Sequence, residues 1–163
     1  MVGSSIGVQL AALTDVGMRR TTNQDSHAIL PADSQELLHA RGHLLMVADG
    51  MGAHAAGELA SKLAAEGVPY LYRKYTELSP PDALLRAFRE TNIEINRRGS
   101  ANTDFHNMGT TSSVLVLLPQ GAITCAIGRG NSPMEVPQVT SCGQRLYADK
   151  RQQPALLDLV ATR

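Results

Sequence analysis

The chain has 163 residues, which predicts one domain, and its 15 basic and 15 acidic side chains give a formal net charge of zero. Without a basic surplus, and with only 4% aromatic residues, the sequence disfavours a nucleic-acid partner. No apolar run approaches the roughly 20 residues that span a bilayer, and two cysteines without metal or disulfide spacing fit a reducing compartment, so we expect a cytoplasmic protein with no membrane partner.

The N-terminal third predicts two strands joined by a polar loop. Residues 6–13 alternate apolar and polar side chains, as a strand does, and residues 27–30 read as a second short strand. The loop between them carries Arg20 and Asp25. Arginine suits a phosphate or carboxylate and aspartate suits a metal, whereas the alternative is a solvated loop with an Asx turn. Residues 31–42 read as a connection.

A buried strand beginning at His43 is the centre of the sequence. The apolar run over residues 44–48 ends at Asp49, and glycines follow at positions 50, 52 and 57, with His54 among them. An acidic residue at a strand tip, beside backbone oxygens that glycine leaves accessible, suits a hard divalent cation. The alternative is an ordinary Asp-Gly turn.

Two helices are predicted next. Apolar residues over 60–71 recur at helical spacing, with Ser61 on the solvent face, and Pro69 predicts a kink or stop close to Gly67. Ser79 followed by proline predicts the start of the second helix, and Gly99 predicts its end.

A β-hairpin follows, with strands over residues 114–118 and 122–127 around a turn. Beyond Gly128 the sequence changes character, and only residues 154–160 read as one more short helix.

Three segments together carry a family resemblance. They are residues 14–26, which include Arg20 and Asp25, residues 47–58 with the sequence VADGMGAHAAGE, and residues 108–111 with the sequence MGTT. In order and spacing they resemble the metal-dependent protein phosphatases of the PPM type (protein phosphatase type 2C), over roughly the first 128 residues.

The resemblance implies an α+β fold, part of a four-layer α-β-β-α sandwich with antiparallel sheets, and a binuclear Mn²⁺ or Mg²⁺ centre. Water between the metals attacks phosphoserine or phosphothreonine in that family. By resemblance, Asp49 bridges the metals, the Gly50 carbonyl binds one, and Asp25 coordinates directly or through water. Arg20 binds phosphate and His54 is a candidate general acid, its alternative being a helix-start residue that touches no substrate.

The sequence also departs from the family pattern. Gln24 stands where an acid is usual, although some bacterial members have glutamine, and Gly128-Arg129-Gly130-Asn131-Ser132 replaces the family's Gly-Asp-Ser-Arg. Two later metal-binding aspartates have no counterpart. We therefore expect a partial phosphatase domain over residues 1–128, apparently truncated there by a shifted reading frame or premature end. The tail, residues 129–163, is not assignable to the family.

The expected function is that of a protein serine/threonine phosphatase acting on a phosphorylated protein. Because the ligand set is incomplete, the alternative is a non-catalytic truncated remnant or a phosphoprotein-binding module. A sandwich cut after its early strands leaves an open sheet edge, so edge-to-edge self-association is also expected.

Overall fold

The computed structural model describes residues 2–5, 7–18, 20–52, 55–127 and 140–141. The expected tail helix over residues 154–160 lies outside these ranges. The elements, in chain order, are β1 (Val2–Ser5), β2 (Val8–Ala11), β3 (Asp25–Leu30), α1 (Gln35–Ala40), β4 (His43–Met51), α2 (Ala56–Lys74), α3 (Pro80–Ala101), a 3₁₀ turn η1 (Thr103–Phe105), β5 (Gly109–Leu118), β6 (Gly121–Ile127) and β7 (Thr140–Ser141).

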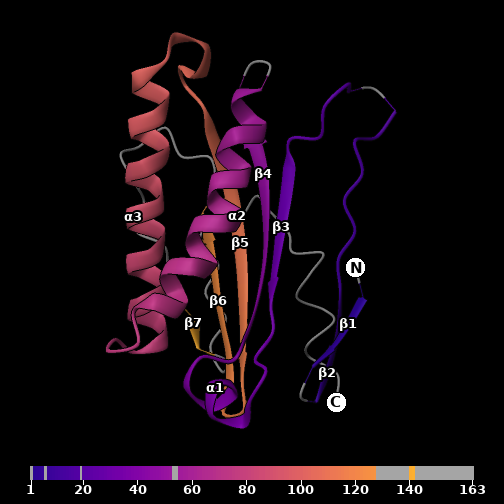
Figure 1. Ribbon diagram of the computed structural model, residues 1–163, viewed down its shortest axis with the longest axis vertical. Coiled ribbons are helices and arrows are strands. Elements are labelled where there is room, and N and C mark those ends of the chain that lie inside the picture. Colours follow the sequence, from indigo (N-terminus) through magenta and orange to yellow (C-terminus); the bar gives the residue numbers. More distant parts are fainter. Residues whose placement is uncertain (1, 6, 19, 53–54, 128–139, 142–163) are drawn as a thin grey trace.

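The strands form a five-stranded sheet of order β3-β4-β5-β6-β7 and a separate two-stranded sheet, β1-β2. All pairings are antiparallel. Helices α2 and α3 lie side by side across one face of the larger sheet (Figure 1). The predicted α+β class with antiparallel sheets is confirmed. The described residues show one helical layer against the five-stranded sheet, with β1-β2 as a separate sheet.

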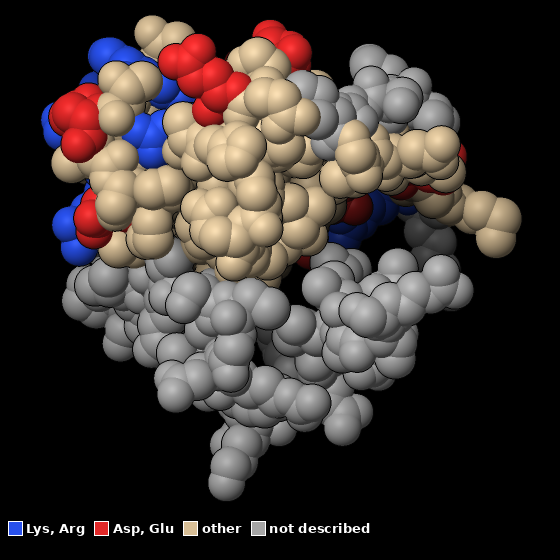
Figure 2. Space-filling view, turned by 90° about the horizontal axis from the view of Figure 1, so that it is seen from below, with Lys and Arg blue, Asp and Glu red and all other residues tan. Residues whose placement is uncertain are grey.

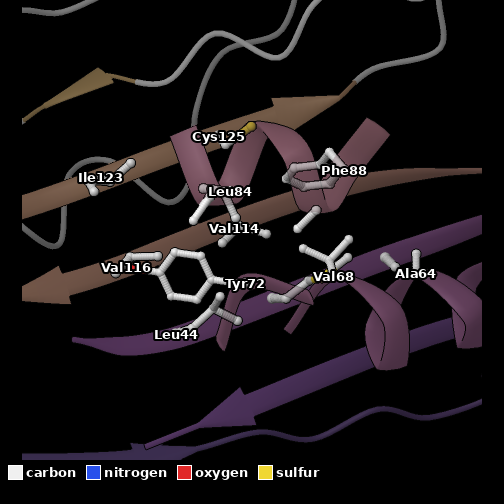
Figure 3. Packing of buried hydrophobic residues seen from close by; sticks show 14 of the residues in the cluster. Leu44, Ala64, Val68, Tyr72, Leu84, Phe88, Val114, Val116, Ile123 and Cys125 are labelled. Atoms are coloured by element: carbon white, nitrogen blue, oxygen red, sulfur yellow. The ribbon is translucent and has the colours of Figure 1, made fainter. Parts of the chain in front are cut away.

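Strand alternation builds the core between the larger sheet and the helices. Leu44, Met46 and Ala48 of β4 all face the helices and are at most 2% exposed. Tyr72 of α2 lies beside Leu44 and Val116 in Figure 3. Its hydroxyl donates to the Arg41 carbonyl at 2.8 Å, and burial raises the pKa of Tyr72 to about 12. Small residues on α2 let this helix approach the sheet closely.

The structure corrects three predictions about the helices. Of the kink or stop predicted near Gly67, the stop is wrong, because α2 continues through Pro69 to Lys74. A proline inside a helix costs about 3 kcal/mol, whereas burying each large side chain of this turn contributes about 1.5–3 kcal/mol, so packing prevails. Ser61 is fully buried rather than exposed. α3 starts after its Ser79 cap as predicted but runs past Gly99 to Ala101.

The N-terminal strands also differ from the prediction. The expected strand over residues 6–13 is only Val8–Ala11, and it pairs with an unpredicted strand, Val2–Ser5. Gly7 has φ +75°, which allows a tight turn between them. β3 begins at Asp25, two residues earlier than predicted, and the connection that follows contains α1. The hairpin β5-β6 is confirmed, with β5 extended back to Gly109.

The described surface carries charges of both signs. In the view of Figure 2, basic and acidic side chains lie interspersed and form no broad patch of one sign. On α3, Glu94 accepts hydrogen bonds from Arg97 and Arg98, which lower the pKa of its carboxyl to about 2. Such exposed pairs contribute little to stability. Within the described residues, no helix combines the length and apolar character needed to cross a bilayer.

Candidate metal centre

The pairing of β3 with β4 brings two carboxylates together at one end of the larger sheet. Asp25 and Asp49 are direct partners in the antiparallel register. Side chains of directly opposed residues lie on one face, with Cβ atoms about 4.5–5.5 Å apart. Because Ala48 and its alternate neighbours face the helices, Asp49 projects from the opposite, exposed face. Sequence reasoning placed both residues at the site, but only the register shows them opposed.

The electrostatics of this pair favour a cation. Partial burial, the negative charge of Asp49 and a hydrogen bond between the two carboxyl groups raise the pKa of Asp25, and the charge of Arg20 opposes this rise. Two like charges this close are costly to ionise together. A divalent cation between the two carboxylates would offset this repulsion. Arg20 is exposed and near enough for its charge to act on the site.

Gly50 is packed too tightly for any side chain. Its N–H donates to the Gln24 carbonyl at 3.0 Å. A Cβ on Gly50 would lie 2.0 Å from the carbonyl oxygen of Gly57 and 2.6 Å from that of Gln24. The backbones of β4, the loop before β3 and the first turn of α2 therefore touch one another directly. This contact fixes the position of the Asp49–Gly50 segment.

Gln24, which departs from the usual family residue, has a packing role here. Its side-chain amide lies against Gly57, where an added Cβ would come within 3.0 Å of the Gln24 Cδ atom. The same amide donates to the Gly52 carbonyl at 3.4 Å, which is a long contact. A carboxylate at this position could not donate to that carbonyl and would repel it. The sequence showed the substitution but not this contact.

Side chains of the preceding loop position Asp25. Asn23 accepts a hydrogen bond from the Asp25 N–H at 3.0 Å and donates to the Thr14 hydroxyl at 2.8 Å. Asp15 accepts from the N–H of Gly17 at 2.7 Å, where the backbone has φ +72°. Asx turns are therefore present, as the alternative interpretation of this loop predicted. They hold the start of β3 in place for its carboxylate.

Strand β5 supports the backbone at Asp49. The Thr110 hydroxyl lies 3.0 Å from the Asp49 carbonyl oxygen and 2.7 Å from that of Thr111, so its single proton can bond either oxygen. Thr111 is the direct partner of Asp49 in the β4–β5 register. The threonines of the MGTT segment thus support the sheet backbone.

The described residues supply only part of a metal site. They include no group of three or more His, Cys, Asp or Glu side chains arranged to hold an ion. Asp25, Asp49 and the Gly50 carbonyl are hard oxygen donors of the kind that Mg²⁺ and Mn²⁺ prefer. His54 lies outside the described residues. The geometry therefore provides two opposed carboxylates with an arginine nearby, which suits a cation that in turn binds phosphate.

Comparisons with known proteins identify the family of this chain. The family model described as "Protein phosphatase 2C" matches residues 18–134. A putative protein phosphatase 2C-type of Streptococcus pyogenes is 33% identical over 124 residues, 74% of this chain and 48% of the relative. Protein phosphatase PhpP of Streptococcus pneumoniae is 31% identical over 126 residues, again 74% of this chain and 48% of the relative.

A solved structure shows a similar fold. The serine/threonine phosphatase PstP/Ppp of Mycobacterium tuberculosis superposes with a TM-score of 0.56 at 28% identity, covering 82% of this chain and 53% of that one. The chain thus spans about half the length of the curated streptococcal relatives it matches.

Proposed function

The chain belongs to the protein phosphatase 2C family, and from that membership we propose that it hydrolyses phosphoserine or phosphothreonine in a phosphorylated protein. The family is metal-dependent, and its named relatives include serine/threonine protein phosphatases. The observation that supports the proposal best is the opposition of Asp25 and Asp49 across β3 and β4, with Arg20 close enough to affect the pKa of Asp25.

Asp25, Asp49 and the Gly50 carbonyl are the proposed ligands for Mn²⁺ or Mg²⁺. The opposition of the two carboxylates and the hard oxygen donor set fit such an ion. When bound, the ions supply a water of lowered pKa for attack on phosphorus and neutralise charge on the phosphoryl oxygens. The protein's part is to hold the two carboxylates in register and to keep the Gly50 carbonyl fixed through backbone contacts.

Arg20 and His54 are proposed to act on the substrate. The guanidinium of Arg20 would bind the phosphate oxygens in a bidentate manner and keep its charge at any physiological pH. His54 would donate a proton to the serine or threonine oxygen as it leaves, a role suited to an imidazole that titrates near neutral pH. We further propose a phosphatase domain over residues 1–128, with residues 129–163 as a separate tail, and a cytoplasmic location.

A second candidate function follows from the small number of ligands. Two carboxylates without a third acidic or histidine partner among the described residues would bind metal weakly. With Arg20 still available for phosphate, the chain would then be a non-catalytic phosphoprotein-binding module.

The two functions are separated by metal content and turnover. The full chain is loaded with Mn²⁺ or Mg²⁺, analysed for bound metal, and assayed on a phosphothreonine peptide. We expect metal-dependent release of phosphate that Asp49→Asn lowers by about 100-fold or more, the usual effect of removing a group that stabilises charge in the transition state. Asp33→Asn, which changes an exposed aspartate before α1, is the matched control. Turnover that survives Asp49→Asn would contradict the mechanism, and phosphopeptide binding without turnover would favour the binding module.

A further inference from the structure

The outer edge of β3 has free hydrogen-bonding groups. β3 is the first strand of the five-stranded sheet, with β4 on its other side. The Gly50 N–H donates to the Gln24 carbonyl, which makes these two residues a hydrogen-bonded pair of the antiparallel ladder. Because hydrogen-bonded pairs occur at every second residue, Ser26, Ala28 and Leu30 also direct their backbone groups to β4. His27 and Ile29 consequently direct their N–H and C=O groups outward. Among the described residues, none of these outward groups has a hydrogen-bond partner.

A groove runs along this edge between β3 and α2. Its volume is about 620 Å³, and its walls are mostly apolar, formed in part by Ala28, Leu30, Pro69 and Tyr70. Tyr70 is 66% exposed although it adjoins these apolar residues. An exposed aromatic ring beside an apolar groove is typical of surfaces that bind a partner.

Hydrogen bonds between the strand segment and α2 bound the groove at both ends. Near Asp25, the hydroxyl of Ser26 lies 3.0 Å from that of Ser61 on α2. At the far end, the Arg73 guanidinium donates to the carbonyl of Pro31, just after β3. Arg73 and Lys74 both line the groove and make this end basic. The basic end of the groove therefore lies furthest from the carboxylate pair, and Glu66 lines the groove about two helical turns earlier on α2.

We propose that an extended segment of the phosphoprotein substrate adds to β3 as an antiparallel strand, with an apolar side chain in the groove and acidic side chains at Arg73 and Lys74. This inference rests on the proposed function. Strand addition satisfies the outward groups of His27 and Ile29, while the groove selects alternate side chains of the segment. Because β3 begins at Asp25, the same strand leads the segment to the carboxylate pair. In antiparallel pairing each peptide residue lies opposite one residue of β3, and the phosphorylated residue lies near Asp25. The acidic residues near Arg73 and Lys74 are then about four to six positions before the phosphorylated one.

A second copy of the chain fits the edge less well. In an edge-to-edge pair, the helix-facing side chains of the incoming β3 would be Ala28 and Leu30, which already pack in part against the core of their own copy. They could not enter the groove of the first copy. A peptide strand has both of its faces free. The self-association expected from the sequence would therefore use the outward backbone groups of His27 and Ile29 but would leave the groove empty.

The test uses the full chain and a fluorescein-labelled phosphothreonine peptide with acidic residues and one leucine before the phosphorylated position. Binding is followed by fluorescence anisotropy. Ile29→Pro removes an outward N–H without breaking a β3–β4 bond, and Ile29→Val is the matched control that keeps this N–H. We expect Ile29→Pro to weaken binding about tenfold relative to Ile29→Val, since one hydrogen bond is lost and its neighbours are misaligned.

A charge exchange gives the second measurement. Lys74→Glu is expected to weaken binding of the acidic peptide and to improve binding of a peptide with lysines at the same positions. Equal affinities of folded Ile29→Pro and Ile29→Val would overturn the proposal. So would sedimentation showing that Ile29→Pro only dissociates a dimer, because a second copy would then occupy the edge. Hydrolysis of a small aryl phosphate, which is too short to reach the groove, tests the proposed function separately.

Discussion

The two faces of the five-stranded sheet differ in what they do. The face covered by α2 and α3 is closely packed, and Leu44 and Val116 have no exposed surface. On the opposite face Val47 is 57% exposed, and Asp25 and Asp49 lie beside each other. Because side chains alternate along each strand, packing on one face fixes the register that opposes the carboxylates on the other. Stability and chemistry therefore depend on alternate residues of the same strands.

The sharpest test of this difference compares neighbouring apolar residues of β4. Leu44→Ala on the covered face is expected to lower the free energy of unfolding by about 2–5 kcal/mol, because it leaves a cavity in the core. Val47→Ala on the exposed face should cost less than about 1 kcal/mol. Urea denaturation followed by circular dichroism measures both. Equal losses would mean that the two faces are equally buried in solution.

A smaller effect is expected where the covered face meets the metal centre. Gly50→Ala forces a methyl group against the Gly57 carbonyl oxygen, and overpacking of this kind costs about 1–3 kcal/mol. It should also reduce Mn²⁺ binding, because the Asp49–Gly50 backbone must shift. Gly109→Ala on β5 is the control, since its Cβ would meet only the Met51 methyl at 3.6 Å. Calorimetric titration with Mn²⁺ and thermal melting report the two effects, and a Gly50→Ala chain as stable as Gly109→Ala would contradict the contact.

The smallest effect belongs to the exposed face and depends on pH. Because the pKa of Asp25 is raised in the folded chain, the native state keeps a proton that the unfolded chain loses just above 3.8. The free energy of unfolding therefore falls as pH rises from this value through the raised pKa. In metal-free buffer, Asp25→Asn should remove this contribution to the pH dependence, while that of Glu94 remains, and should add about 0.2–1 kcal/mol near neutral pH, the usual cost of opposed like charges. Asp33→Asn is the control that should keep the pH dependence of the unaltered chain, and identical pH dependence in Asp25→Asn would show that no repulsion acts on Asp25.

Local patterns predicted the elements whose residues carry their own signals. The apolar run before Asp49, the Ser79 cap and the turn at Pro119 were enough to place β4, the start of α3 and the β5-β6 hairpin. Strand β1, with two serines and a glycine in four residues, has no such signal. The helix containing Pro69 was misjudged because tertiary burial, which a local pattern does not contain, outweighs the lost hydrogen bond.

The candidate site was predicted from residue identities but not from their arrangement. Asp25 and Asp49 stood out as carboxylates beside strands, and the family resemblance supplied their roles. Their direct opposition depends on strand register, which arises from packing between residues far apart in the chain. The burial of Ser61 against Ser26 and the packing of Gln24 against Gly57 are long-range contacts of the same kind. The roles of Arg20 and His54 remain predictions.

The contact between Gly50 and Gly57 has a consequence for how this sequence can change. An added Cβ on Gly50 would meet only backbone atoms of Gly57 and Gln24, so this position cannot gain a side chain by shortening another one. An added Cβ on Gly57 would lie 3.0 Å from the Gly50 backbone and from the Gln24 side chain. In apolar cores a larger residue at one position is often compensated by a smaller residue at a neighbouring position. Such compensation cannot relieve a contact with backbone atoms. Gly50 and Gly57 therefore constrain each other, and a larger residue at position 57 would also have to displace the Gln24 side chain.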